Sequence, residues 1–414
     1  MTEEKQIEDR KLIEHKAVPK LRFREFDDEW EFKKFGEITT KVGSGSTPKG
    51  GSNVYQQKGI PFIRSQNVIQ NQLILDNTFI SEEINKKMKG SIVRPNDVLL
   101  NITGASIGRS CLVPNDFKCG NVNQHVCIIR LKNNYAPKFI QVFLSSEKGQ
   151  RLVDQGQTGS GREGLNFQSI RLFKSRFPSL PEQQKIASFL SAVDKKIQQL
   201  TRKKELLETY KKGVMQKLFS QEIRFKPAQS GAEGNDNGKD FLAWQTKRLG
   251  EIFTITAGGD IKKGNVSKLR TAQFRYPVYA NSDKNKGLYG YSDIYKIDYD
   301  CVTVTGRGAL GIANARVEKF YPIVRLLVLK PKQKGNVIFY ENLINSFNFF
   351  IESTGVPQLT APQISIYKMK IPCFEEQQKI ADFLAAIDKK IEAVSQQIEK
   401  TQCFKKGLLQ QMFV

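Results

Sequence analysis

Apolar residues recur at intervals of three and four along two segments of the chain, 182–219 and 376–413. This spacing is the a/d stripe of a coiled coil, and it predicts a long helix for each segment. A stripe so narrow needs a partner helix, and each segment is the natural partner of the other. The predicted interface residues are Ile186, Leu190, Val193, Ile197, Leu200 and Leu207 in the first segment, and Ile380, Leu384, Ile387, Ile391, Val394 and Ile398 in the second.

The connection between the segments favours one direction of pairing. At 1.5 Å per residue, each predicted helix is roughly 57 Å long. Residues 221–240 are polar and glycine-rich, and a flexible coil of that length spans about 25 Å. Because this is shorter than the helix, we expect an antiparallel pair; a parallel pair would need the second large domain to bridge the distance. Lys204 and the pair Lys211 and Lys405 interrupt the apolar stripe.

The chain also repeats itself. The sequence EQQKIA begins at Glu182 and again at Glu376, and a W-x5-G-E-I motif begins at Trp30 and again at Trp244. Strand-like runs bounded by Gly, Asn and Pro lie between these motifs. The runs are 60–63, 97–102, 126–131, 301–304 and 323–329.

This order predicts a pseudo-twofold internal repeat in which mixed α/β heads alternate with long helices that form an antiparallel coiled coil. The predicted segments are an N-terminal extension (1–20), a first head (21–180), a first helix (181–220), a linker (221–240), a second head (241–372) and a second helix (373–414).

The amino-acid composition indicates what kind of partner the protein binds. Lys and Arg outnumber Asp and Glu by 65 to 42, a formal charge of +23, which favours a polyanion such as nucleic acid. No apolar run is long enough to cross a bilayer, and the N-terminus has no secretory signal, so we expect a cytoplasmic protein without a membrane partner. The six cysteines form no CxxC pair and only two histidines accompany them, which predicts reduced thiols and no metal site.

Several catalytic motifs are missing. The sequence has no G-x4-G-K-[ST] phosphate loop, so we expect no ATP hydrolysis by this chain. It also has no Asn-Pro-Pro-Phe motif of the adenine methyltransferase type and no convincing cluster of nuclease carboxylates. A binding protein is therefore favoured over an enzyme.

The repeated motifs resemble the DNA specificity subunit of Type I restriction-modification systems. The resemblance covers nearly the whole chain beyond about residue 20 and is carried by the doubled EQQKIA helix start, the doubled W-x5-G-E-I motif, the run DVLLNITGASIGR at 97–109, and a G-x3-L-[NT] motif before each helix. One departure is Phe374–Glu375 where the first copy has Leu180–Pro181, which blurs the start of the second helix.

The resemblance implies that each head is a target recognition domain that reads one half of a bipartite sequence in double-stranded DNA. The paired helices would set the gap between the halves. Two methyltransferase subunits and, in the complete complex, two endonuclease subunits would bind the chain. S-adenosylmethionine, ATP and Mg²⁺ would be used by those partners, and no cofactor is expected on this chain.

Two other functions stay open. A self-contained DNA-modifying enzyme with an unfamiliar active site would act on DNA alone. A stand-alone regulatory or architectural DNA-binding protein would need no methyltransferase.

Polar loops next to the predicted strands are the candidate DNA contacts. Glycines at 104 and 108 allow the backbone to approach a phosphate, arginine suits guanine, and Asn or Gln suits adenine. The candidates in the first head are Ser46, Lys49, Arg64, Ser65, Asn67, Asn101, Thr103, Ser106, Arg109, Gln157, Thr158 and Arg162. Those in the second head are Lys262, Lys263, Asn281, Ser282, Lys284, Thr305, Arg307 and Thr354.

Each candidate has a plainer interpretation. Loops of this composition are often ordinary strand turns or solvated linkers. His125 is expected to be a structural histidine, and the charges on the helices are expected to face solvent or a partner subunit. Phe189 and Phe383 lie outside the apolar stripe, and we expect them to pack on a head or on a partner helix.

Overall fold

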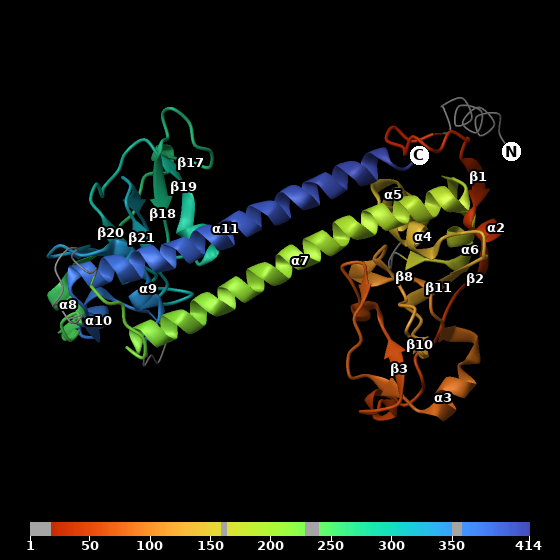
Figure 1. The fold of residues 1–414 in the computed structure, drawn as a ribbon, viewed down its shortest axis with the longest axis horizontal. Coiled ribbons are helices and arrows are strands. Elements are labelled where there is room, and N and C mark those ends of the chain that lie inside the picture. The colour runs from red at the N-terminus through yellow and green to blue at the C-terminus, as the bar shows by residue number, and fades with distance from the viewer. Residues whose placement is uncertain (1–17, 159–163, 228–239, 350–357) are drawn as a thin grey trace, which may run out of the picture. The chain divides into compact units, whose positions relative to one another are not determined.

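The computed structural model describes residues 18–158, 164–227, 240–349 and 358–414. The chain divides into two compact units: one ends at Leu200 and resumes at Gln396, and the other runs from Thr201 to Ser395. Each unit holds one head and parts of both long helices, α7 (Leu180–Phe219) and α11 (Phe374–Gln411) (Figure 1). No helix among the described residues is long and apolar enough to cross a membrane.

The first head is built on two four-stranded sheets. One is antiparallel throughout, and the other contains a parallel pair, β3 with β10. The first sheet has the order β2 (Thr39–Ser44), β11 (Val126–Leu131), β8 (Val98–Asn101) and β9 (Ser110–Leu112). The second has the order β6 (Phe79–Ile80), β3 (Ile60–Ile63), β10 (Gly120–Val122) and β7 (Ile92–Val93).

The second head repeats this plan, including a parallel pair in its smaller sheet, β18 with β22. Its antiparallel sheet has the order β16 (Phe253–Ala257), β23 (Leu327–Pro331), β20 (Cys301–Val304) and β21 (Ala313–Arg316). Its smaller sheet has the order β17 (Val266–Ser267), β19 (Leu288–Ser292), β18 (Tyr276–Tyr279) and β22 (Tyr321–Pro322).

A strand pair and short helices join each head to its long helix. The pairs are β1 (Glu31–Lys34) with β14 (Lys174–Phe177), and β15 (Gln245–Arg248) with β24 (Lys368–Ile371). The short helices are α2 (Phe35–Ile38), α4 (Pro137–Leu144), α5 (Glu147–Gly156) and α6 (Phe167–Leu172) in the first head, and α8 (Leu249–Ile252), α9 (Val337–Asn345) and α10 (Ala361–Ser365) in the second. The first head also has α3 (Glu82–Lys87) and the pairs β4 (Val68–Ile69) with β5 (Gln72–Leu73) and β12 (Gln157–Thr158) with β13 (Gly164–Leu165).

Four of the five predicted strand runs are confirmed, and one is wrong in its first half. The run at 323–329 was expected to be one strand because it is almost wholly apolar. In the structure β23 begins only at Leu327, because Val324 and Arg325 take left-handed backbone angles, with φ of 51° and 58°. This turn lies between β22 and β23.

The apolar stripes of the long helices face one another within each unit, as predicted. In the first unit Ile186 and Leu190 share a core with Leu408 of α11 and with Met412, which follows the helix. In the second, the stripe at the start of α11 shares a core with Leu218 at the end of α7. The beginning of each helix therefore packs against the end of the other, which is an antiparallel pair.

Burial along the stripe is uneven. Ile186, Leu190, Leu200, Ile380, Leu384, Ile387 and Val394 are buried, while Val193, Ile197, Leu207, Ile391 and Ile398 are half-buried.

Two of the three lysines that interrupt the stripe are neutralised by a carboxylate on the facing helix, while Lys204 pairs with Glu208 of its own helix. Lys211 Nζ donates to both carboxylate oxygens of Asp388, at 2.7 and 2.8 Å, and in the other unit Lys405 Nζ donates to one oxygen, Oδ1, of Asp194. The two pairs are copies, since both residues of each lie 194 positions from their counterparts. A lysine in an apolar seam is thus tolerated because a carboxylate on the facing helix meets it.

The EQQKIA motif begins each helix with buried polar contacts. Glu182 accepts two hydrogen bonds from Arg22, at 2.8 and 2.7 Å, and its side chain is 1% exposed. Gln183 then accepts from the Ala136 backbone N–H and donates to the Pro178 carbonyl. In the second helix Glu376 and Gln377 make the matching contacts, with Arg224 as the cation.

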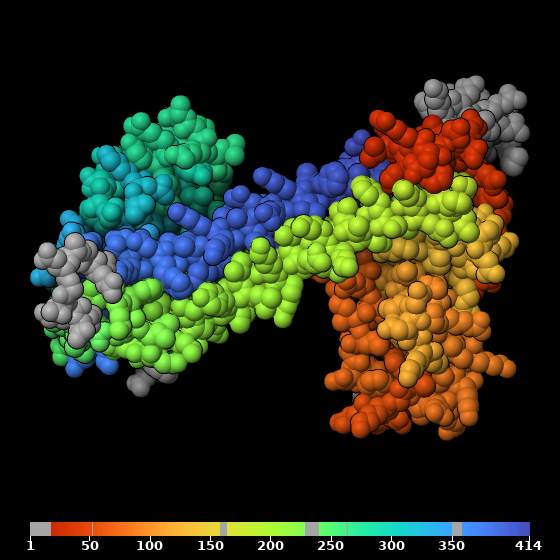
Figure 2. All heavy atoms as spheres, in the orientation of Figure 1, coloured from red at the N-terminus to blue at the C-terminus, as the bar shows by residue number. Residues whose placement is uncertain are grey.

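These contacts reveal a repeat that the sequence analysis missed. Residues 21–24 read LRFR and residues 223–226 read IRFK, and each segment lies on the start of a long helix. In Figure 2 the first segment, in red, covers the beginning of α7. Phe189 packs edge-on against Phe23, with ring centroids 5.6 Å apart, and Phe383 packs likewise against Phe225. Phe23 belongs to the segment predicted as the first head, whereas Phe225 lies in the predicted linker.

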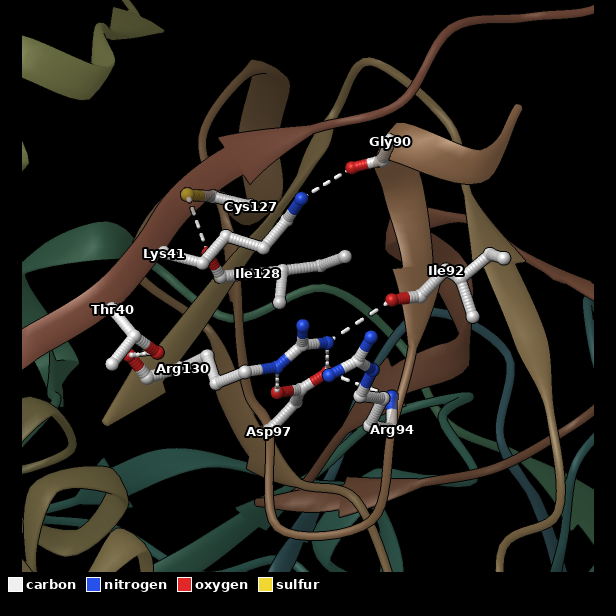
Figure 3. Close-up of polar contacts among 9 residues, drawn as sticks. All are labelled: Thr40, Lys41, Gly90, Ile92, Arg94, Asp97, Cys127, Ile128 and Arg130. Carbon is white, nitrogen blue, oxygen red and sulfur yellow. Dashed lines mark hydrogen bonds and ion pairs between the residues drawn. The ribbon is translucent and has the colours of Figure 1, made fainter. Parts of the chain in front are cut away.

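A buried ion pair ties the two sheets of the first head together. Asp97, 1% exposed, accepts from Arg130 Nε and Nη2 at 2.8 Å each and from the Arg94 backbone N–H at 2.7 Å (Figure 3). Arg130 also donates to the Ile92 carbonyl of β7, and Lys41 of β2 donates to the carbonyl of Gly90. The turn before β8 is therefore fixed from both sheets.

Candidate nucleic-acid interface

In the first head the candidate loops meet around Asn101, at the end of β8. Its amide Nδ2 donates to the Ser65 carbonyl at 2.9 Å and to Ser106 Oγ at 3.1 Å. These bonds join the loop after β3 to the turn between β8 and β9. Asn101 is fully buried, and its Oδ1 has no hydrogen-bond partner among the described residues.

A second set of bonds brings two more loops to the same place. Thr47 donates to Gln124 Oε1 at 2.6 Å, and Gln124 Nε2 lies 3.1 Å from His125 Nε2. Because an amide nitrogen only donates, His125 Nε2 accepts, and in the neutral ring Nδ1 carries the proton toward Thr103 Oγ1. Gln124 is exposed and His125 half-buried, so His125 is a hydrogen-bonded structural residue, as expected, and it holds loops of this cluster together.

Arg64 is held by its own head. Its Nη2 donates to Asp76 at 2.8 Å and to Thr78 Oγ1 at 2.7 Å, and its guanidinium lies 6.0 Å from the centre of the Tyr55 ring. Partial burial opposes ionisation of Asp76, but hydrogen bonds from Thr78, Gln66 and Arg64 outweigh it and lower the pKa of Asp76 to about 2. Arg64 thus shapes its loop rather than projecting as a free cation.

Three predicted contact residues are buried and cannot reach DNA in this conformation. Asn67 caps its own loop, since it accepts from the Arg64 N–H and donates to the Ile74 carbonyl. Asn101 joins two loops as described, and Thr305 in the second head donates to Ala309 and accepts from Ile312. Each of these short polar side chains satisfies the backbone of its own turn, which the sequence pattern could not show.

The remaining candidates of the first head lie at or near the surface. Ser46, Lys49 and Arg109 are exposed, and Ser65, Thr103, Ser106 and Gln157 are half-buried. Arg109 lines a cleft of about 1130 Å³ together with Lys405 and Lys406 of α11, and its backbone carbonyl accepts from the Asn101 N–H at 2.8 Å. The side chain of Thr158 and the whole of Arg162 lie outside the described residues.

In the second head one residue, Asn281, joins the loops. Its Oδ1 accepts from the Gly306 N–H at 2.8 Å, and its Nδ2 donates to the Val324 carbonyl. The loop after β18, the turn between β20 and β21 and the turn before β23 are thus held together. The topology places these loops where the corresponding loops of the first head lie.

The other candidates of the second head surround this centre. Arg307 donates from Nε and Nη2 to Gln358 Oε1, at 3.3 and 3.0 Å, and is half-buried. Lys262 and Lys284 are exposed, and Ser282 accepts from the Lys284 N–H. The side chain of Lys263 and the whole of Thr354 lie outside the described residues.

Metal ligands and thiols were the other candidate reactive groups among the described residues. None of their His, Cys, Asp and Glu side chains gather into a group of three that could hold a metal ion. All six cysteines are free, and burial raises the pKa of Cys111, Cys127 and Cys301 to about 12. These thiols stay protonated at neutral pH and are poor nucleophiles.

The doubled head and helix match a known family over most of the chain. Residues 27–209 and 242–401 each match the Type I restriction modification DNA specificity domain. The chain belongs to this family. The protein is therefore a type I specificity subunit with two specificity domains, and its role is DNA specificity.

Relatives and solved structures agree with the family. A type I specificity subunit of Mycoplasma pneumoniae is 28% identical over 63% of this chain and 67% of its own length. The specificity subunit of the type I restriction enzyme MjaX of Methanocaldococcus jannaschii is 21% identical over 94% of both chains. The crystal structure of the S subunit of the type I system of M. genitalium has the same fold, with a TM-score of 0.61 at 16% identity, over 96% of this specificity subunit and 99% of that chain.

Proposed function

We propose that this chain is the noncatalytic DNA-recognition subunit of a type I restriction-modification complex, and that each head reads one half of an asymmetric bipartite site in double-stranded DNA. One observation carries the proposal. Both heads gather loops at the same ends of the same sheets, yet the loops differ in sequence. Two heads that share a fold but differ in loop sequence are suited to recognising two half-sites of different sequence.

The charge of the chain supports the choice of ligand. A formal charge of +23 and exposed cations at Lys49, Lys262 and Lys284 suit the phosphate backbone. Backbone contacts of this kind position a protein, while polar groups aimed into the groove select the sequence. Gln124 is exposed in the loop cluster of the first head and is suited to an adenine.

The helical pair is the natural spacer between the half-sites. With 40 residues, α7 is about 60 Å long, and the major groove returns to one face of the duplex every 34–36 Å or so. Once the width of the heads is subtracted, such a rod suits half-sites about one helical turn apart. The gap in the DNA would then follow from the register and length of the two helices.

The internal repeat also suits a chain that binds two copies of each partner. The two units carry equivalent surfaces, such as the clefts beside Lys211–Lys212 and Lys405–Lys406. Two methyltransferase subunits would occupy equivalent places, and two endonuclease subunits would join in the complete complex. Those partners would use S-adenosylmethionine, ATP and Mg²⁺, and this chain would supply sequence recognition.

Co-expression with the methyltransferase subunit tests the proposal. The complex should contain about two methyltransferase subunits per chain and should methylate adenines in one bipartite sequence, whereas the purified chain should methylate and cut nothing. Methylation or cutting by the chain alone would instead identify a self-contained enzyme. Specific DNA binding without any association with a methyltransferase would point to a regulatory DNA-binding protein.

A further inference from the structure

The turn between β22 and β23 in the second head holds an unusual residue. Val324 takes a φ of 51° and Arg325 a φ of 58°. A β-branched residue at positive φ is a true outlier, because its branched Cβ collides with the backbone in this region. Such strain persists only where the surrounding structure enforces it.

The backbone of this turn is clamped on three sides. The Val324 N–H donates to the Gly259 carbonyl and the Arg325 N–H to the Gly258 carbonyl, both at 3.1 Å. The Val324 carbonyl accepts from Asn281 Nδ2. Position 258 needs glycine for this approach, because a Cβ there would lie 2.7 Å from the Pro322 carbonyl oxygen.

The stability of the head does not explain the valine side chain. Val324 is 48% exposed, so it fills no core position. On one side it borders a small groove of about 360 Å³ that is lined mainly by apolar side chains, among them Ile261 and Tyr289. Glycine at position 324 would relieve the strain at little cost in packing.

The position of Val324 is at the centre of the candidate interface. Asn281, which accepts from the Gly306 N–H, holds the Val324 carbonyl with its other end. The corresponding turn of the first head, between β10 and β11, carries Gln124 and His125, which are polar. The second head thus presents an apolar group, held rigidly, where the first presents hydrogen-bonding groups.

We propose that Val324 is a specificity-determining residue of the second head that contacts the C5-methyl group of a thymine in its half-site. This inference rests on the proposed function, because it takes the loop cluster to face the major groove. Thymine is the base that shows an apolar group there, and small apolar side chains are its usual partners. The clamped turn fixes the direction of the Cα–Cβ bond of the valine, so that little backbone freedom is lost on binding.

The test uses the complex with methyltransferase subunits and a duplex that carries the site found by methylome mapping. Each thymine of the half-site read by the second head is replaced in turn by deoxyuridine, which lacks only the methyl group. One replacement should weaken binding roughly fourfold, the effect expected for burying one methyl group. In the Val324→Ala complex the same replacement should have a smaller effect, because alanine lacks the two methyl groups of valine that reach furthest toward the base.

Two more variants separate recognition from folding. Val324→Gly should unfold at the same or a higher temperature than the wild type, because the strain is gone, and should still lose the response to deoxyuridine. Val317→Ala is the matched control. Val317 is 67% exposed, and it directly follows β21 at the end of that strand that lies away from the turn holding Gly306. It should keep the full response.

Three results would overturn the inference. The wild-type complex would bind every deoxyuridine duplex equally, or the Val324→Ala complex would keep the wild-type response, or Val317→Ala would abolish it. A duplex in which the bases of this half-site are scrambled distinguishes failure of the inference from failure of the proposed function. If scrambling leaves binding unchanged, the proposed function fails together with the inference; if it abolishes binding while deoxyuridine has no effect, only the inference fails.

Discussion

At the scale of single residues, several polar side chains in the heads stabilise the loops that carry them by hydrogen bonds. Asp76 anchors Arg64, Thr78 and Gln66, and these bonds hold its pKa near 2, below the value of about 3.9 in an unfolded chain. Its carboxylate therefore adds stability above about pH 4, and this contribution is lost as the pH falls toward 2.

Asp76→Asn should lower the stability of the protein at pH 7 by up to about 1 kcal/mol, a small value because Asp76 and Arg64 are each about a third exposed. Thermal unfolding of both proteins from pH 7 to pH 2.5 measures the effect. The difference between them should shrink below pH 4. A difference that stays constant over this range would rule out the ion pair as its cause.

Glu341 on α9 behaves in the opposite way. Burial raises its pKa, against the pull of Lys286 and Lys211, so ionisation costs stability at neutral pH and the cost is absent below its unfolded pKa of about 4.3. The equivalent position in the first head is Gln141.

Glu341→Gln should therefore raise stability at pH 7 by on the order of 1 kcal/mol and leave it unchanged near pH 3.5. Urea unfolding at the two pH values checks this. Equal stability of variant and wild type at pH 7 would contradict the assignment.

The roles of individual polar side chains were the feature least predictable from the sequence. The pattern located the right loops, but it could not separate an Asn that faces solvent from one, such as Asn67 or Asn101, that the loop uses for itself. That difference depends on which carbonyls come within 3 Å after folding. Gln124 lies beside the predicted strand at 126–131 and Val324 lies inside the predicted strand at 323–329, so neither stands out in the sequence as a contact residue.

At the scale of elements, the long helices were the most predictable feature, because the a/d stripe and the repeated start are local signals. The segments LRFR and IRFK were missed since four residues carry little pattern. Their role becomes visible only when Arg22 meets Glu182 across 160 positions. The strand expected at 323–329 failed for a related reason: Gly258, Gly259 and Asn281 enforce its turn from elsewhere in the chain.

Arg22→Ala and Arg224→Ala should both destabilise their own units, because each leaves a buried carboxylate without its cation, a loss of about 3–5 kcal/mol. The two costs should differ. Glu376 keeps a hydrogen bond from Trp244 Nε1 at 3.1 Å, whereas Trp30 Nε1 has no partner among the described residues.

Calorimetry should therefore show a larger loss for Arg22→Ala than for Arg224→Ala. The exposed neighbour Arg24 supplies the control, and Arg24→Ala should change stability by less than about 0.5 kcal/mol. Equal losses for all three variants would show that the buried pairs have no special role.

At the scale of the whole molecule, the account depends on the helices as a spacer. Removing one heptad from each helix, residues 201–207 and 395–401, keeps the a/d pattern and shortens the pair by about 10.5 Å. The methylated site should lose about three base pairs from its gap and keep both half-sites. An unchanged gap would show that the helices do not set it.

Each head is proposed to read its own half-site. The most direct measurement is a methylome map of a host that carries the chain with residues 241–371 replaced by the second head of another specificity subunit. One half-site should change and the other half-site should stay as it was. A map in which both half-sites change, or neither does, would contradict the account.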